Sequence, residues 1–199
     1  EDSPSPIGPL LCWQQPHPIM YAELLRRAGT ERNTLASYAE LVFATADFMA
    51  DYAQEEGSGR CVLGPPLIPA QEIHQPAETL NPTFEIEYWR WGLERALSWH
   101  ELFGSESAQT GREARYRDIL SRLASPATGS YGEGLRVYLA HELCPDTYAS
   151  CAKDHPSTLL ALGMLPGESI DKAVMSSTYD AVSASWDFSS SWGWDFPAM

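Results

Sequence analysis

The sequence predicts a mainly α-helical protein built from antiparallel helical hairpins, with a few short strands in its loops. Apolar residues recur at steps of three and four over several long stretches, which is typical of helices that bury one face. The loops between these stretches are alternately short and long, as expected when consecutive helices pair antiparallel. A helical repeat protein would show a fixed repeat length, and this sequence has none.

The composition describes a globular chain whose acidity excludes some partners. The 199 residues fit a single domain, 1–199, that can bury a core, and 44% of them are hydrophobic against 20% charged. A formal charge of −14 leaves no basic stripe to neutralise phosphates, so we expect neither nucleic acid nor an anionic membrane as a partner. No apolar run is long enough to span a bilayer. The seven tryptophans and nine tyrosines either stack on sugars or form the core.

Local signals predict a loop, two helices and a strand in the first third of the chain. Residues 1–18 are proline-rich and predict a loop, and a helix follows over 19–28 until Gly29 ends it. A long helix is expected over 31–54, and residues 61–63 suit a short strand. The buried stripe expected on the long helix consists of Leu35, Tyr38, Leu41, Val42, Thr45, Phe48, Met49 and Tyr52.

The rest of the chain predicts further helices and one long loop. The expected elements are helices over 83–102, 111–124, 159–165 and 168–186, a turn-rich connection over 126–134 and a short strand over 135–140. Residues 141–157 form a loop that is rich in histidine and carboxylate side chains. Loops of this length inside compact domains are usually functional or disordered, and the residue types here favour function.

A proline-rich stretch from Gly64 presents the carboxylate of Glu72 ahead of the helix that begins at residue 83. Its prolines fix φ and remove backbone donors, so this stretch is neither a helix interior nor a central strand. A side chain on such a stiff, irregular segment is well placed for a defined role. The apolar neighbours Leu67, Ile68 and Ile73 favour the neutral acid at Glu72, and the alternative is an ordinary surface glutamate.

The phrase Pro-Ala-Gln-Glu at 69–72, followed by Asn81 at the opening of a helix, resembles the six-hairpin (α/α)6-barrel glycosidases. The resemblance is to glycoside hydrolase family 95 in particular, and more distantly to family 65. Two later phrases match as well: His155-Pro156-Ser157 ahead of the turn at 163–167, and Gly193-Trp194-Asp195. The resemblance implies that the helical hairpins form part of an (α/α)6 toroid. This chain is then expected to be the C-terminal part of the catalytic domain, with the N-terminal half as its partner.

The resemblance implies an inverting glycoside hydrolase that needs no cofactor and acts on an oligosaccharide, with an extracellular location. Glu72 is the expected general acid and Asp195 its expected partner, because glycoside cleavage uses two carboxyl groups on either side of the scissile bond. Asp195 can instead cap a helix, and the residue that activates water can lie outside this chain. The alternatives are a non-catalytic carbohydrate-binding or scaffold protein, and a glycoside phosphorylase.

Polar and aromatic residues in the loops are the candidates for binding sugar hydroxyls and ring faces. They are Trp13, Gln14, His17, His74, Asn81, His141, Glu142, Asp146, His155, Trp192 and Trp194. For the first three the alternative is packing at the start of a helix. His74 either tunes Glu72 or faces solvent, and the loop histidines can also lack a function. We expect no metal site, because the chain has no HExxH motif and the spacing of its histidines and carboxylates is irregular.

The four cysteines, Cys12, Cys61, Cys144 and Cys151, include no CxxC pair and no zinc-ribbon spacing. Cys144 and Cys151 lie in one loop, so they either form a local disulfide or remain free thiols. Cysteine usage therefore does not decide the redox compartment.

Overall fold

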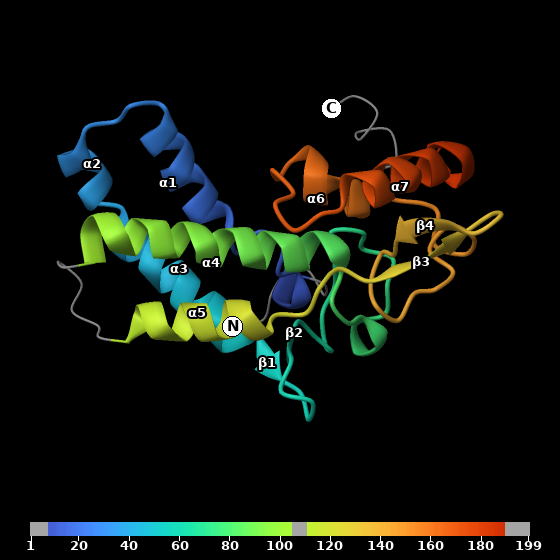
Figure 1. Ribbon diagram of the computed structural model, residues 1–199, viewed down its shortest axis with the longest axis horizontal. Coiled ribbons are helices and arrows are strands. Elements are labelled where there is room, and N and C mark those ends of the chain that lie inside the picture. The colour runs from blue at the N-terminus through green and yellow to red at the C-terminus, as the bar shows by residue number, and fades with distance from the viewer. Residues whose placement is uncertain (1–7, 105–110, 190–199) are drawn as a thin grey trace. The chain divides into compact units, whose positions relative to one another are not determined.

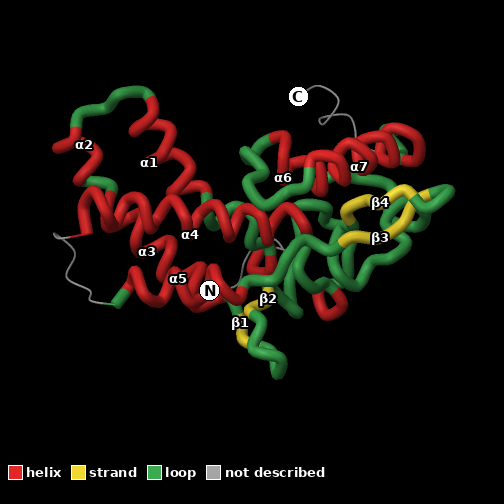
Figure 2. Tube along the Cα trace, viewed as in Figure 1, coloured by secondary structure: helices red, strands yellow, loops and turns green. Residues whose placement is uncertain are grey.

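The computed structural model describes residues 8–104 and 111–189, and within these ranges it is mainly α-helical (Figure 1). The strands are confined to two short antiparallel pairs (Figure 2). The prediction of a mainly α-helical fold with short strands in its loops is therefore confirmed. In the same two ranges no helix combines the length and the apolar character needed to cross a membrane.

The chain forms two compact units. Unit 1 consists of residues 1–13, 63–87 and 124–199, and unit 2 of residues 14–62 and 88–123. Each unit is thus assembled from separate stretches of sequence, an organisation that the single predicted domain did not include. Helix α4 (Thr83–Phe103) begins in unit 1 and continues into unit 2 without a break.

Unit 2 is helical. It holds α1 (His17–Arg27), α2 (Arg32–Ala36), α3 (Ala39–Tyr52), most of α4, and α5 (Arg112–Arg122), with α3 packed against α1 and α5. The helices predicted over 19–28, 83–102 and 111–124 are confirmed. The chain also forms a hairpin of β1 (Gln54–Glu55) and β2 (Cys61–Val62), with Glu55 opposite Cys61.

The single helix expected over 31–54 is wrong, because the chain breaks it into α2 and α3 at Ser37 and Tyr38. The backbone N–H groups of Ser37 and Tyr38 donate to the carbonyls three residues earlier, Thr34 and Leu35, at 3.2 and 2.9 Å. The Ser37 hydroxyl binds the Thr34 carbonyl as well, at 2.6 Å. Bonding over three residues tightens the turn and stops the α-helical ladder.

The buried face of α3 also differs from the expected stripe. Leu41 and Phe48 are 48% and 44% exposed, whereas alanines fill much of the interior surface. The buried residues of α3 are Ala39, Val42, Phe43, Ala46, Met49 and Ala50. Trp89 of α4 donates its indole N–H to the Met49 carbonyl at 2.9 Å. The small alanine side chains let large side chains such as Trp89 approach α3 closely. A prediction that considers only large apolar residues does not find a buried face of this kind.

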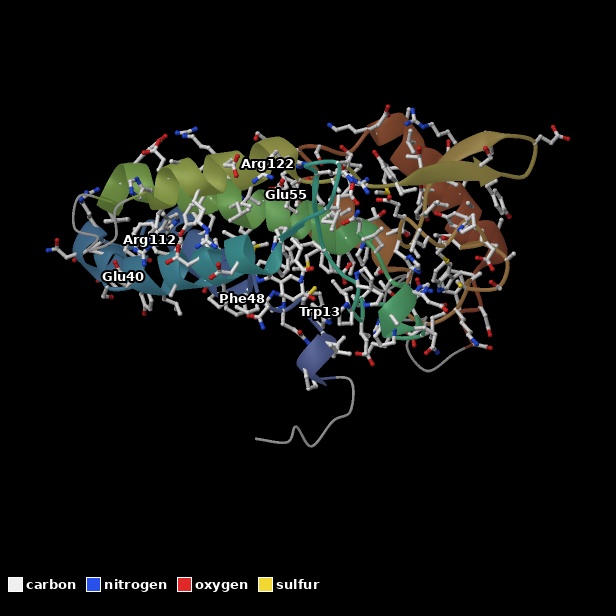
Figure 3. The ribbon with its side chains drawn as sticks, turned by 90° about the horizontal axis from the view of Figure 1, so that it is seen from below. Trp13, Glu40, Phe48, Glu55, Arg112 and Arg122 are labelled. Carbon is white, nitrogen blue, oxygen red and sulfur yellow. The ribbon has the colours of Figure 1, made fainter. Side chains whose placement is uncertain are left out.

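Arginine–carboxylate pairs hold unit 2 together. Arg112 of α5 is 6% exposed and donates to Asp47 Oδ2 at 2.9 Å and to Glu40 at 3.4 Å. Arg112 and Glu40 are labelled in Figure 3. The Tyr116 hydroxyl donates to the other oxygen of Asp47 at 2.7 Å. Arg122, near the end of the same helix, donates to Glu55 at 2.6 Å and anchors the β-hairpin.

A second pairing in unit 2 surrounds Glu23, which is 1% exposed on α1. Its two oxygens accept hydrogen bonds from Arg26 at 2.7 Å and from Arg27 at 3.0 Å, and the Trp99 indole N–H lies 3.3 Å away. Burial by itself would raise the pKa of Glu23, but these hydrogen bonds outweigh it and lower the pKa to about 2. The carboxylate therefore stays charged inside the unit.

Unit 1 combines a short hairpin with a helix. Strand β3 (Thr128–Tyr131) pairs antiparallel with β4 (Leu135–Tyr138), and α7 (Lys172–Ser185) packs against β4. Helix α6 (Leu160–Gly163) is a single turn. The core of this unit consists of Tyr138, Ala152, Leu159, Ala161, Ile170, Val174, Met175, Val182 and Trp186.

The strand expected over 135–140 is confirmed at a shorter length, whereas β3 lies in the stretch expected to be a connection. The helix expected from residue 168 begins only at Lys172. Asp171 caps it, because its carboxylate accepts from the N–H groups of Ala173 and Val174 at 2.8 and 3.3 Å.

Candidate functional site

The proline-rich loop of unit 1 is fixed to its surroundings through buried hydrogen bonds. Ala70 N–H donates to Glu85 Oε1 at 2.6 Å, in the first turn of α4. The Gln71 side-chain amide donates to the carbonyls of Cys151 and Lys153 at 2.6 and 2.8 Å. The loop that carries Glu72 is therefore attached on one side to α4 and on the other to the loop at 141–157.

Glu72 itself lies at the surface, in a turn between two buried residues, Gln71 and His74. Leu67 and Ile68 are buried at 0% and 4% exposure, but they form part of the interior and do not cover the carboxyl. Within the described part of the chain, the prediction that apolar residues enclose the Glu72 carboxyl is therefore wrong. What the structure provides is an accessible acidic side chain on a fixed segment.

Burial raises the pKa of Glu85 to about 7, and the bond from Ala70 N–H opposes the shift only in part. The residue is 0% exposed, and Glu85 Oε2 has no hydrogen-bond partner among the described residues. Sequence reasoning assigned the neutral carboxyl to Glu72 and missed Glu85, because a glutamate in an amphipathic helix normally faces water. The available signal was the apolar residue on each side of it, Phe84 and Ile86.

Asn81 and Glu142, both predicted to bind substrate, meet inside unit 1. Asn81 is fully buried with a φ of 49°, a left-handed conformation that asparagine tolerates better than most residues. Its side chain accepts from Leu63 N–H at 2.8 Å and donates to Glu142 Oε2 at 2.7 Å, and its own N–H donates to the Leu63 carbonyl at 2.9 Å. Asn81 thus joins three segments and presents nothing to a ligand here.

His74 and His141 are brought together from loops that are distant in the sequence. They are 8% and 4% exposed, and their rings meet edge to face with centroids 4.7 Å apart. Desolvation lowers the pKa of both, and the neighbouring His141 adds to the effect on His74, whose pKa is about 4. Both rings are therefore neutral near pH 7, and of the two alternatives for His74 the one in which it faces solvent is wrong.

Two cysteines complete this cluster. Cys144 is 3% exposed, Cys151 is half-buried, and their sulfur atoms lie 3.4 Å apart without a disulfide. A ring nitrogen of His74 and the two sulfur atoms all lie within 4.8 Å of one another. Burial raises the pKa of Cys144 to about 12, so in this arrangement it is a thiol. Among the described residues, His74, Cys144 and Cys151 form a group that could hold a metal ion.

Beside the cluster lies a shallow, open hollow of about 160 Å³, lined by Ser130, Tyr131, Gly132, Pro145, Asp146, Tyr148 and Ala149. The rings of Tyr131 and Tyr148 meet edge to face there, with centroids 5.5 Å apart. Asp146 is exposed and accepts from the Ser150 hydroxyl, which lowers the pKa of Asp146. The hollow is smaller than the roughly 300–1,000 Å³ of typical ligand pockets.

The other candidates lie apart from this arrangement or outside it. His155 is half-buried, with Nε2 3.8 Å from Asp154 Oδ1. Trp13 is half-buried in unit 1, and Gln14 is exposed in unit 2. His17, also in unit 2, lies at the start of α1 with Nδ1 2.8 Å from the Tyr88 hydroxyl, so it packs as a helix-start residue. Asp195, Trp192 and Trp194 lie outside the described residues.

Comparison of the chain with protein-family models and with the sequences of curated proteins gives no match.

Proposed function

We propose that this chain carries the acid-bearing part of an inverting glycoside hydrolase, with Glu72 as the general acid. The observation that supports the proposal is the setting of Glu72: an accessible carboxyl on a turn whose buried flanking residues are both hydrogen-bonded, Gln71 to two backbone carbonyls and His74 to Gln71. A general acid must reach the leaving oxygen in a defined geometry, and side chains on fixed segments supply that geometry.

In this proposal Glu72 gives its proton to the glycosidic oxygen as the bond to the sugar breaks. A second carboxylate, either Asp195 or one outside this chain, takes a proton from a water that attacks the opposite face of the ring. Because Glu72 is exposed, the bound oligosaccharide has to cover the carboxyl and exclude water, so that the proton stays in place until the leaving oxygen accepts it.

The hollow beside the cluster supports a sugar as the ligand. Tyr131 and Tyr148 offer aromatic surface for the C–H face of a sugar ring, and the Asp146 carboxylate offers acceptors for hydroxyl groups. Both kinds of group lie in the same unit as Glu72. The hollow fits a part of an oligosaccharide rather than a whole one.

The test is to replace Glu72 with Gln in the complete polypeptide, with Glu78→Gln as the matched control, because Glu78 is also an exposed glutamate of this loop. Removal of a general acid typically costs about 10²–10⁴ in rate on substrates with poor leaving groups. We expect that loss on unactivated oligosaccharides, and a much smaller one on aryl glycosides whose leaving group needs no proton. Full turnover of oligosaccharide by the Glu72→Gln variant would reject the proposal.

The exposure of Glu72 favours one second candidate, a carbohydrate-binding protein without catalytic activity. In that case both glutamine variants bind oligosaccharide like the parent chain, and none of the three proteins hydrolyses it. The phosphorylase alternative is disfavoured by charge, because only Arg136, Lys153 and Lys172 are basic in unit 1. Turnover that depends on inorganic phosphate would restore it.

A further inference from the structure

The loops at 64–82 and 141–157 place three potential metal ligands around one point in unit 1. A ring nitrogen of His74, Cys144 Sγ and Cys151 Sγ lie within 4.8 Å of one another. Thiolate sulfur and neutral imidazole nitrogen together are the donors that zinc and other soft divalent ions prefer. We propose that His74, Cys144 and Cys151 form a binding site for such an ion, with Zn²⁺ as the expected occupant.

The separation of the two sulfur atoms distinguishes this site from a disulfide. A disulfide joins its sulfurs at about 2.05 Å. Two thiolates that bind one tetrahedral zinc, each at about 2.3 Å, lie ~3.8 Å apart. The observed distance between Cys144 Sγ and Cys151 Sγ is 3.4 Å, which is nearer to the second value. A small outward movement of either cysteine side chain brings the two sulfur atoms to the separation of two zinc-bound thiolates.

The protein also fixes which nitrogen of His74 is available. The Gln71 side-chain amide donates to two backbone carbonyls, those of Cys151 and Lys153, so the amide orientation of Gln71 is settled. Its Oε1 then faces His74 Nε2 at 3.1 Å and accepts a hydrogen bond from the N–H at this position. The lone pair of His74 is therefore on Nδ1. Metal-binding histidines usually donate their second N–H in this way, and this contact orients the ring.

Gln71 links the ligands to one another as well. It holds His74 through its oxygen and the backbone of Cys151 through its nitrogen, so a single buried side chain positions a ligand from each loop. His141, by contrast, accepts the Leu143 N–H on Nδ1 at 3.2 Å and thus carries its proton on Nε2. We therefore assign His141 to the wall of the site, packed edge-on against His74, and leave it out of the ligand set.

The charge of unit 1 favours a cation. Unit 1 holds three of the 13 basic residues and fifteen of the 27 acidic ones, which gives it −12 of the chain's formal charge of −14. Asp146 Oδ1, 3.7 Å from Cys144 Sγ, is the carboxylate oxygen at the edge of the site. When the ion binds, each thiol loses its proton to solvent, so two positive charges replace two protons and no oxidation or reduction takes place.

The test is a titration of the reduced polypeptide with Co²⁺, a spectroscopic substitute for Zn²⁺. We expect one ion per chain, an intense thiolate-to-cobalt absorption band, and loss of the band when Zn²⁺ is added. Cys151→Ser should remove most of the band, and it is the preferred variant because Cys151 is only half-buried. Cys61→Ser, at a buried cysteine of unit 2, is the matched control and should retain the band.

Gln71→Leu tests the site without touching a ligand. Loss of a residue that orients a metal ligand typically weakens metal binding about 10–100-fold. We expect that decrease in Co²⁺ affinity with the band still reached at saturation. The proposal is overturned if the reduced chain gives no thiolate band, if the band survives in Cys151→Ser, or if Cys144 and Cys151 form a disulfide whose reduction leaves a chain that binds no ion. These outcomes do not depend on glycosidase activity.

Discussion

The pKa values of two buried glutamates, Glu23 in unit 2 and Glu85 in unit 1, are shifted in opposite directions. In unit 2, the buried Glu23 accepts hydrogen bonds from Arg26 and Arg27, which lower its pKa to about 2, and the half-buried Asp47 accepts from Arg112. In unit 1, Glu85 is met by the backbone N–H of Ala70, and its pKa rises to about 7. His74, His141 and Cys144 of unit 1 are held in their neutral forms by the same lack of solvent.

The two units differ in their arginine content. Ten of the 13 basic residues, all arginines, lie in unit 2, and they account for the arginine–carboxylate pairs described above. Paired charges make a rigid structure but leave few groups able to exchange a proton or bind an ion. Unit 1 holds neutral carboxyl, imidazole and thiol groups, among them Glu85, His74 and Cys144, and perturbed groups of this kind are typical of functional sites. The comparison therefore favours unit 1 for the proposed sites.

The largest expected effect is on the charge network of unit 2. Asp47→Ala removes the main partner of Arg112, which is 6% exposed, and one acceptor of the Tyr116 hydroxyl. Arg112 keeps its longer bonds to Glu40, and we expect the loss of the shorter, buried pair with Asp47 to cost about 3 kcal/mol in the free energy of unfolding, measured in urea. The control is Glu113→Ala, which breaks the exposed pair with Arg117 and should change stability by less than about 0.5 kcal/mol. Equal effects of the two variants would show that burial of Arg112 has no special role.

In unit 1, we expect the replacement of Asn81 to lower the free energy of unfolding by a somewhat smaller amount. Asn81→Ala removes the acceptor of Leu63 N–H and one donor to the Glu142 carboxylate, and it places alanine at a positive φ. Together these changes cost about 2–3 kcal/mol. Asn81→Gly removes the hydrogen bonds but accepts the backbone conformation, so it should destabilise by about 1 kcal/mol less. Were glycine no better than alanine, the left-handed conformation would not matter.

The next effect is the change in the free energy of unfolding with pH that the titration of Glu85 produces. The folded chain holds this proton up to about pH 7, whereas the unfolded chain loses it near 4.5, so the folded state binds more protons between these values. The free energy of unfolding therefore falls as the pH rises through this window, by up to roughly 3 kcal/mol. Glu85→Gln should lack this part of the slope. Parallel pH profiles for the parent chain and the variant would contradict the assignment.

Most helices could be predicted from sequence because their signals are local. Gly29 ends α1, and Asp171 caps α7 three residues after the expected start of that helix. The break between α2 and α3 was missed because it consists of three-residue hydrogen bonds at Ser37 and Tyr38, and neither proline nor glycine marks these positions in the sequence. Strand β3 was missed because its residues, Thr128–Tyr131, carry glycine and serine and become a strand only by pairing with β4.

Sequence reasoning named the histidines of the cluster, but it named neither Cys144 and Cys151 as ligands nor the arrangement of the four residues. His74, His141 and the loop at 141–157 were identified from their residue types, and the loop that presents Glu72 was correctly predicted to be irregular. The pairing of His74 with Cys144 and Cys151 joins positions about 70 residues apart, and no local spacing encodes such a contact. Glu85 was missed for a related reason, because its burial depends on Ala70 from the preceding loop.

The smallest expected effect, at Glu23, has the opposite sign from that at Glu85. Its carboxylate is stabilised by Arg26 and Arg27, so its contribution is complete above pH 4.5 and is lost as the pH falls toward 2. We expect about 1–2 kcal/mol, less than the shift alone would give, because the two arginines are 40% and 56% exposed and solvent screens them. Glu23→Gln should flatten the acid side of the stability profile, and acid unfolding identical to that of the parent chain would contradict this. Since one group loses stability below pH 4.5 and the other above it, their combined contribution is greatest near that pH, and each variant should remove one side of the maximum.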